Sequence, residues 1–162
     1  METGLRYFQT LAAGVLIGKI ALLSFVVAPM LAAQLDRPTF ARVVRRLFPA
    51  YYAMGMGAAG AGLLAVAGLG VLLGPRPVTG LSAGLWLLVL AAEWYCRSSL
   101  TPRSNRLRDE LKQQEEHGAV SPALQAEWEM LHRRSLWLNS LVLVIGLCVL
   151  GLITFMSLQG GV

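Results

Sequence analysis

The fold is decided by the stretch LWLNSLVLVIGLCVLGLITFMSL (Leu136–Leu158), which carries no charged residue over 23 positions. The hydrocarbon core of a bilayer is about 30 Å thick, and a helix that rises about 1.5 Å per residue crosses it in about 20 apolar residues. The stretch therefore predicts a transmembrane helix. Three further segments meet the same requirement, at about residues 7–33, 50–73 and 79–100.

The whole chain is too apolar for a water-soluble domain. Its 162 residues are 56% hydrophobic and only 14% charged, whereas soluble domains carry about 25% charged residues. The apolar runs are continuous rather than alternating, which favours helices over a transmembrane barrel. The sequence therefore predicts an all-α membrane protein: a four-transmembrane-helix bundle that forms a single domain over residues 1–162, with the lipid bilayer as its surroundings.

Basic residues gather on one side of this predicted bundle. With four spans, the first and third connections share a side, and they carry ten basic residues against two on the other side. Positively charged connections tend to stay in the cytoplasm. We therefore expect a multi-pass protein of a bacterial inner membrane, with both termini on the non-cytoplasmic side. The ten residues are Arg37, Arg42, Arg45, Arg46, Arg103, Arg106, Arg108, Lys112, Arg133 and Arg134; the two are Arg6 and Arg76.

The first connection, residues 37–52, has the pattern of an amphipathic helix. Apolar residues recur at helical spacing on one face, and arginines occupy the other. Asp36 is a suitable N-cap, and Pro49 marks a bend into the second span. This predicts a short helix in the cytoplasmic membrane interface, whose arginines lie near anionic lipid headgroups or hold an anionic substrate. The apolar face comprises Phe40, Val43, Val44, Leu47 and Phe48, and the arginines are Arg37, Arg42, Arg45 and Arg46.

Residues 101–135 predict a cytoplasmic helical hairpin that extends the third and fourth spans. Residues 102–116 are rich in helix formers, Gly118 can end that helix, and Ser121-Pro122 is a suitable start for the next. That second helix continues without a break into the span at 136–158. The mixed charges of the hairpin either form solvated faces or dock a protein partner. Aromatic residues near the same boundary, including Tyr51, Tyr52 and Trp94, fit an interfacial belt.

Small residues at helix-contact spacing predict close packing of the spans. Small faces let helix backbones approach each other in lipid, where no hydrophobic effect drives helices together. The packing is either within one chain or between the subunits of a homo-oligomer. The GxxxG pairs are Gly14/Gly18, Gly70/Gly74 and Gly80/Gly84, and the second span adds the run Gly55, Gly57, Gly60 and Gly62.

Lys19 and Glu93 are the charges that lie deep inside the predicted spans. Counted from the outer ends of their helices, they lie at depths of roughly 18 and 21 Å, so they can meet at one level. An isolated charge at the bilayer centre costs at least about 2.5–3.5 kcal/mol, which favours pairing. We predict a Lys19–Glu93 ion pair with Arg97 as a competitor for Glu93. The pair is either structural or a proton- or ion-responsive element, unless the two side chains extend apart toward the interfaces.

Recognisable catalytic chemistry is missing from the sequence. It holds no nucleotide-binding loop, no Ser-His-Asp arrangement and no zinc-protease motif. We therefore expect no enzyme activity, no cofactor, no metal site and no nucleic-acid partner.

Three stretches resemble the transmembrane protein 205-like family, a four-span domain of unknown function. The stretch RPTFARVVRRLFPAYYAMGMG (Arg37–Gly57) has a TF…LFP.YY pattern, TPRSNRLRDE (Thr101–Glu110) has a PR pair, and HRRSLWLN (His132–Asn139) has an H..S…N pattern. The pattern residues are Thr39, Phe40, Leu47, Phe48, Pro49, Tyr51, Tyr52, Pro102, Arg103, His132, Ser135 and Asn139.

The resemblance implies a four-span fold, and it places its pattern residues at one membrane boundary. Asn139 lies just inside the hydrocarbon, where a polar amide requires a partner. We expect a polar cluster of Arg103, His132, Ser135 and Asn139, which either locks the interfacial helix onto the bundle or binds a small ligand or lipid headgroup. A eukaryotic member of the family has been linked to tolerance of a platinum drug, which implies efflux or secretion.

Three functions follow as hypotheses. The first is a small, oligomeric transport or efflux component, which relies on Lys19, Glu93 and the glycine faces. The second is a membrane scaffold or assembly factor that docks a partner through its cytoplasmic hairpin. The third is a four-span redox or metal component, against which the absence of histidines inside the membrane argues.

Overall fold

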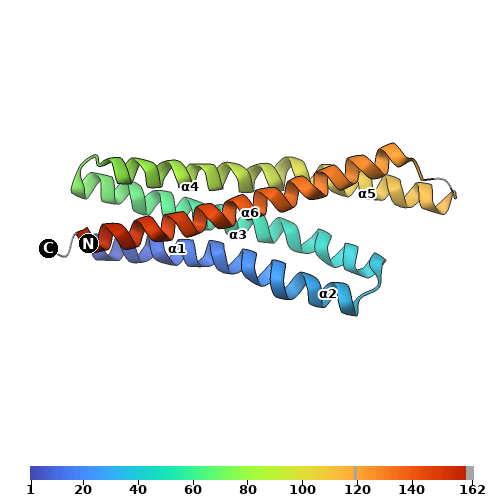
Figure 1. Cartoon of the computed structure of the whole chain (residues 1–162), viewed down its shortest axis with the longest axis horizontal. Coiled ribbons are helices and arrows are strands. Elements are labelled where there is room, and N and C mark those ends of the chain that lie inside the picture. Colours follow the sequence, from blue (N-terminus) through green and yellow to red (C-terminus); the bar gives the residue numbers. More distant parts are fainter. Residues whose placement is uncertain (119, 160–162) are drawn as a thin grey trace.

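The computed structural model describes residues 1–118 and 120–159 as a bundle of four long helical rods (Figure 1). Each rod is long and apolar enough to cross a membrane, which confirms the predicted all-α four-span fold and makes the chain an integral, multi-pass membrane protein. The Val162 end lies outside the described residues. The helices are α1 (Glu2–Leu22), α2 (Ala28–Gln34), α3 (Arg37–Leu73), α4 (Pro77–Tyr95), α5 (Thr101–Glu116) and α6 (Pro122–Gln159).

The rods follow one another around a ring. Within this ring α1 packs against α3, α3 against α4, α4 against α6, and α6 back against α1. Consequently α1 faces α4 across one diagonal of the bundle, and α3 faces α6 across the other. The α2–α3 and α5–α6 connections lie at one end, here called the arginine-rich end, and Met1 and the α3–α4 connection lie at the opposite end (Figure 1).

Two short π-helical turns interrupt the rods near the arginine-rich end. The first, η1 (Leu23–Val27), joins α1 to α2, and the second, η2 (Cys96–Leu100), joins α4 to α5. Each is followed within two residues by a proline, Pro29 or Pro102. A proline has no backbone N–H to donate to the preceding turn, which disturbs the regular hydrogen bonding of the helix there. Such π turns frequently occur at functional sites.

The amphipathic segment after Asp36 forms the first turns of α3, and this corrects the prediction of a separate interfacial helix. The Asp36 side chain caps α3 by accepting from the Thr39 backbone N–H at 3.3 Å, as its position predicts. The helix then runs through Pro49 to Leu73. Phe40, Leu47 and neighbouring apolar side chains of this segment face the cavity between the rods, which packs the segment onto the bundle.

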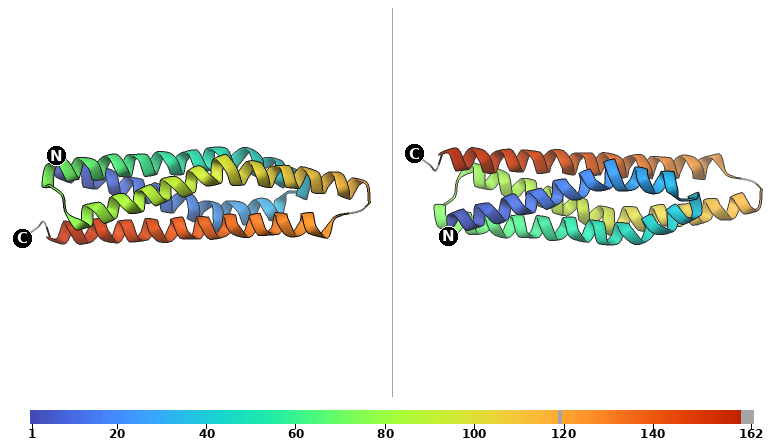
Figure 2. Two further views of the ribbon diagram at one scale, coloured as in Figure 1. Left: turned by 90° about the horizontal axis from the view of Figure 1, so that it is seen from above. Right: turned by 90° about the horizontal axis from the view of Figure 1, so that it is seen from below.

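The hairpin of α5 and α6 has the predicted boundaries. Helix α5 ends at Glu116, Gly118 has a φ of +79°, and α6 begins at Pro122. A left-handed residue after a helix end favours glycine, because a Cβ there is strained. The hairpin projects beyond the α2–α3 connection (Figure 2).

Glycines of α3, together with Gly146 of α6, make close contacts within the chain, whereas the predicted GxxxG pairs of α1 and α4 do not. A Cβ built on Gly62 would lie 2.3 Å from the Trp86 ring, whose side chain is fully buried. By contrast, Gly14, Gly18, Gly80 and Gly84 have nothing within 4 Å of a built Cβ, so they leave small patches on the outside of the bundle.

The Gly62→Ala substitution is expected to destabilise the bundle by about 1–3 kcal/mol, because the added methyl group overpacks against Trp86. Thermal unfolding of the detergent-solubilised protein, followed by circular dichroism, measures the effect. Gly57→Ala is the matched control, since a Cβ at Gly57 meets nothing within 4 Å. Equal melting temperatures for the two variants would contradict the packing described.

Candidate functional site

Lys19 of α1 and Glu93 of α4 meet inside the bundle. Lys19 Nζ lies 2.6 Å from Glu93 Oε1, and the two side chains are 0% and 2% exposed. Because α1 and α4 are diagonal partners, this pair crosses the bundle axis. The structure thus brings the two predicted partners together. Arg97, the predicted competitor, is exposed and forms no ion pair within the part of the chain that the structure describes.

Helix α3 passes directly beside the pair. The Tyr51 backbone carbonyl lies 3.4 Å from Lys19 Nζ, and the centre of the Tyr51 ring lies 3.9 Å from the same atom. A Cβ built on Gly55 would lie 2.4 Å from Lys19 Nζ and from Glu93 Cδ. Gly55 therefore leaves the space that the pair occupies. From the sequence, Gly55 was recognised only as one of a run of glycines.

A second polar contact lies on the same diagonal, nearer the chain termini. Gln9 Nε2 donates to Ser82 Oγ at 2.8 Å, and both residues are fully buried. Gln9 Oε1 and Glu93 Oε2 are also buried, and neither has a hydrogen-bond partner among the described residues. The sequence analysis missed this contact, although an amide inside an apolar span was a usable signal.

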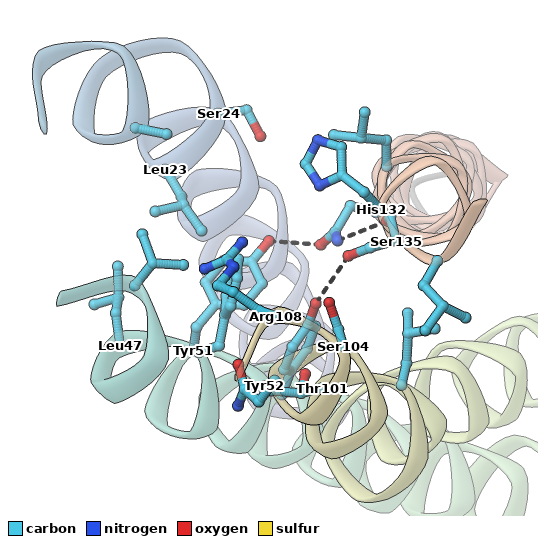
Figure 3. A pocket seen from close by; sticks show the side chains of 18 of the residues that line it. Leu23, Ser24, Leu47, Tyr51, Tyr52, Thr101, Ser104, Arg108, His132 and Ser135 are labelled. Atoms are coloured by element: carbon cyan, nitrogen blue, oxygen red, sulfur yellow. Dashed lines mark hydrogen bonds between the residues drawn. The ribbon is translucent and has the colours of Figure 1, made fainter. Parts of the chain in front are cut away.

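A cavity of about 270 Å³ lies between the rods at the arginine-rich end (Figure 3). All four rods contribute to its wall, and so do both π turns. Its polar residues are Ser24, Tyr51, Tyr52, Thr101, Ser104, Asn105, Arg108, His132, Ser135 and Asn139, and its apolar residues are Leu23, Ala28, Leu31, Phe40, Val44, Leu47, Phe48, Leu100, Leu131 and Leu136.

Hydrogen bonds cross this cavity along the α3–α6 diagonal (Figure 3). The Tyr51 hydroxyl donates to Asn139 Oδ1 at 2.8 Å, and Asn139 Nδ2 donates to the Ser135 carbonyl at 2.9 Å. The Tyr52 hydroxyl lies 3.4 Å from Ser135 Oγ. Both tyrosines are buried, so they do not belong to the lipid-facing aromatic belt that the sequence predicted.

The predicted cluster of Arg103, His132, Ser135 and Asn139 is assembled only in part. Ser135 and Asn139 line the cavity together, and His132 lies at its exposed rim. Arg103 points elsewhere and pairs with Glu127 of α6. Arg108, one turn farther along α5, lines the cavity in its place. The sequence showed both arginines at this boundary, but it did not show which one faces the interior.

Residues of the family pattern divide between the cavity and the surface. Phe40, Phe48 and Tyr52 line the cavity, whereas Thr39, Pro49 and Pro102 do not. Of the four arginines predicted at the membrane surface, Arg37, Arg42 and Arg46 are exposed. Arg45 pairs instead with Asp109 of α5 and also donates to the Asn105 carbonyl at 3.4 Å.

Aromatic stacking orders the rim of the cavity. The rings of Trp128 and His132 lie parallel at 5.4 Å, and the guanidinium carbon of Arg108 lies 5.4 Å from the centre of the Trp128 ring. Desolvation and, second, the charge of Arg108 lower the pKa of His132 below its ordinary value. Both causes disfavour the charged form of His132 at this rim.

The arrangement is suited to binding a small molecule. Cavities with an apolar wall and a few convergent polar groups bind small molecules that have both characters. Within residues 1–118 and 120–159, no three His, Cys, Asp or Glu side chains are grouped closely enough to hold a metal ion. The cavity and the buried pair share Tyr51, so the candidate site comprises both.

Asn139→Leu is expected to destabilise the bundle by about 1 kcal/mol, because the Tyr51 hydroxyl loses its acceptor across the diagonal. The double variant Tyr51→Phe with Asn139→Leu removes both polar groups and is expected to regain most of that loss. Thermal unfolding in detergent compares the variants. A double variant that is less stable than Asn139→Leu alone would show that the hydrogen bond does not brace α3 against α6.

Comparison with known proteins gives a family but no activity. No curated protein and no solved structure matches the chain. The profile of a family described as a domain of unknown function, DUF4149, matches residues 11–113. The matched range contains Lys19, Tyr51, Gly55, Glu93 and Arg108 and covers more than half of the 162 residues. This integral membrane protein therefore belongs to the DUF4149 family.

Proposed function

We propose that this protein is a small transport or efflux component that holds a substrate in the cavity at its arginine-rich end. The observation that carries the proposal is the position of Tyr51. Its hydroxyl spans the cavity to Asn139, while its ring and carbonyl hold Lys19 of the buried pair. A substrate that displaces Tyr51 would therefore disturb the ion pair, and a change in the pair would alter the cavity.

The buried pair is suited to respond to an ion or a proton. Ionisable residues inside a membrane bundle are costly and mark ion paths and proton relays in many transporters. Glu93 Oε2 has no hydrogen-bond partner among the described residues, so this oxygen is available to an incoming proton or cation. The π turns η1 and η2 flank the cavity and supply helix segments that can shift register.

The resemblance to the transmembrane protein 205-like family supports the same function, because it implies efflux or secretion. We further propose a bacterial inner membrane, with the arginine-rich end in the cytoplasm and both termini on the other side. The charge asymmetry supports this orientation. The exposed glycine patches of α1 and α4 support a homo-oligomer, since small faces let helices approach closely.

A scaffold function remains the second candidate, and the projecting hairpin favours it. The end of α5 beyond Leu111 is exposed and charged, and it extends past the α2–α3 connection (Figure 2). A scaffold requires this tip but not the buried pair, so a substitution at Glu93 separates the two functions.

Glu93→Gln is expected to reduce substrate flux at least tenfold. The assay follows transbilayer movement of fluorescent acyl-chain probes with anionic, neutral and cationic heads in vesicles that contain the purified protein. Glu110→Gln, an exposed acid on α5, is the matched control and should retain flux. If the bundle loosens when Lys19 is left unpaired, Lys19→Met with Glu93→Gln restores the packing but not the flux. Wild-type flux in Glu93→Gln, or no flux in the wild type, would contradict the proposal.

Alkaline phosphatase is active only on the non-cytoplasmic side of the membrane, and we expect it to be active when it is fused after Val162. A reporter that is fluorescent only in the cytosol should be fluorescent when it is fused at Gly118 in the hairpin. Inactive phosphatase at Val162, together with fluorescence of the cytosolic reporter at the same position, would overturn the proposed orientation.

A further inference from the structure

Arg108 differs from the other basic residues in its surroundings. Its side chain is half-buried at the cavity wall, and it forms no ion pair within the described part of the chain. The other partly or fully buried cations have acidic partners. These pairs are Arg6 with Glu2, Lys19 with Glu93, and Arg45 with Asp109.

The remaining basic residues that lack an acidic partner are exposed, where water or headgroups solvate them. A half-buried guanidinium has less of this solvation, so an anion placed beside it gains a strong, charge-assisted hydrogen bond. None of the described residues that line the cavity is acidic. The exposed group comprises Arg37, Arg42, Arg46, Arg76, Arg97, Arg106, Arg133 and Arg134.

We infer that the cavity binds an anionic amphiphile, whose phosphate or carboxylate head pairs with Arg108 and whose hydrocarbon chain lies among Leu31, Val44 and Leu47. All three leucine and valine side chains belong to the cavity wall. The inference rests on the proposed function, because it names the substrate class of the same cavity.

The size of the cavity limits the ligand to one chain. Its volume of about 270 Å³ equals roughly nine water volumes of about 30 Å³ each. That space accommodates one short chain or the first part of a longer one. A molecule with two chains would have to leave one chain in the bilayer.

Two of the helices that line the cavity diverge from each other at the arginine-rich end. Helix α2 packs against α3 and diverges from α6 (Figure 1). The cavity lies between them, since its wall includes Ala28 and Leu31 of α2 as well as Ser135 and Asn139 of α6. An amphiphile bound between these two helices would keep its head beside Arg108 and direct its chain toward the apolar residues of α2 and α3.

Dodecyl phosphate tests the inference directly. It is titrated into the full-length protein in nanodiscs of neutral phosphatidylcholine, and the rise in melting temperature reports binding. Arg108→Gln should weaken this binding at least tenfold, and Arg108→Lys should restore part of it. Arg106→Gln, an exposed arginine on the same helix, is the matched control and should bind like the wild type. Ala28→Leu narrows the cavity and should also weaken binding, although Arg108 is intact.

Two further probes identify the source of the anion. Dodecyl maltoside has the same chain without the charge, and inorganic phosphate has the charge without the chain. Each should bind at least tenfold more weakly than dodecyl phosphate. If inorganic phosphate binds as well as dodecyl phosphate, the ligand is not an amphiphile. If Arg108→Gln and the wild type bind dodecyl phosphate equally well, Arg108 does not form the binding site.

The flux assay separates this inference from the proposed function. Arg108-dependent binding of dodecyl phosphate without any flux would support the ligand class and reject the transport function. Flux that is unaffected by Arg108→Gln and is confined to neutral or cationic probes would support transport and reject the ligand class.

Discussion

The ion pair between Lys19 and Glu93 is the interaction on which the rest of the bundle depends. Lipid chains are as apolar as the side chains themselves, so apolar side chains gain no hydrophobic free energy by packing against one another. Buried polar groups therefore have a large part in how the helices align. A charge left alone at this depth is costly, whereas a paired charge fixes the two helices that carry it. The pair joins α1 to α4 across the diagonal, with α3 held against it through Gly55 and Tyr51.

The polar contacts of the bundle form two sets of diagonal braces. Gln9–Ser82 and Lys19–Glu93 join α1 to α4, and Tyr51–Asn139 joins α3 to α6 at the arginine-rich end. Ring neighbours combine small and apolar packing, as between Gly62 and Trp86, with polar contacts such as Lys19 to the Tyr51 carbonyl and Arg45 to Asp109. The Tyr51–Asn139 brace crosses the cavity at the arginine-rich end, so the same contact joins α3 to α6 and forms part of the cavity wall.

Sequence reasoning predicted features that depend on position along a helix and missed those that depend on rotation about it. The four spans, the cap at Asp36 and the turn at Gly118 follow from local composition and backbone preference. The depth match of Lys19 and Glu93 follows from the helix rise alone. The choice of Arg108 over Arg103, and the inward direction of Tyr51, depend on which neighbour each helix faces. Pro49 belongs to the second class too, because packing of the apolar face beside it keeps α3 continuous.

Charge reversal tests the central claim most directly. Lys19→Glu and Glu93→Lys each place two like charges inside the bundle, while the double variant exchanges the two partners and keeps the pair. Melting temperatures of the four proteins in lipid nanodiscs measure the coupling. The account predicts that both single variants melt well below the wild type and that the double variant recovers most of the loss. A double variant no more stable than either single variant would show that Lys19 and Glu93 do not brace the bundle.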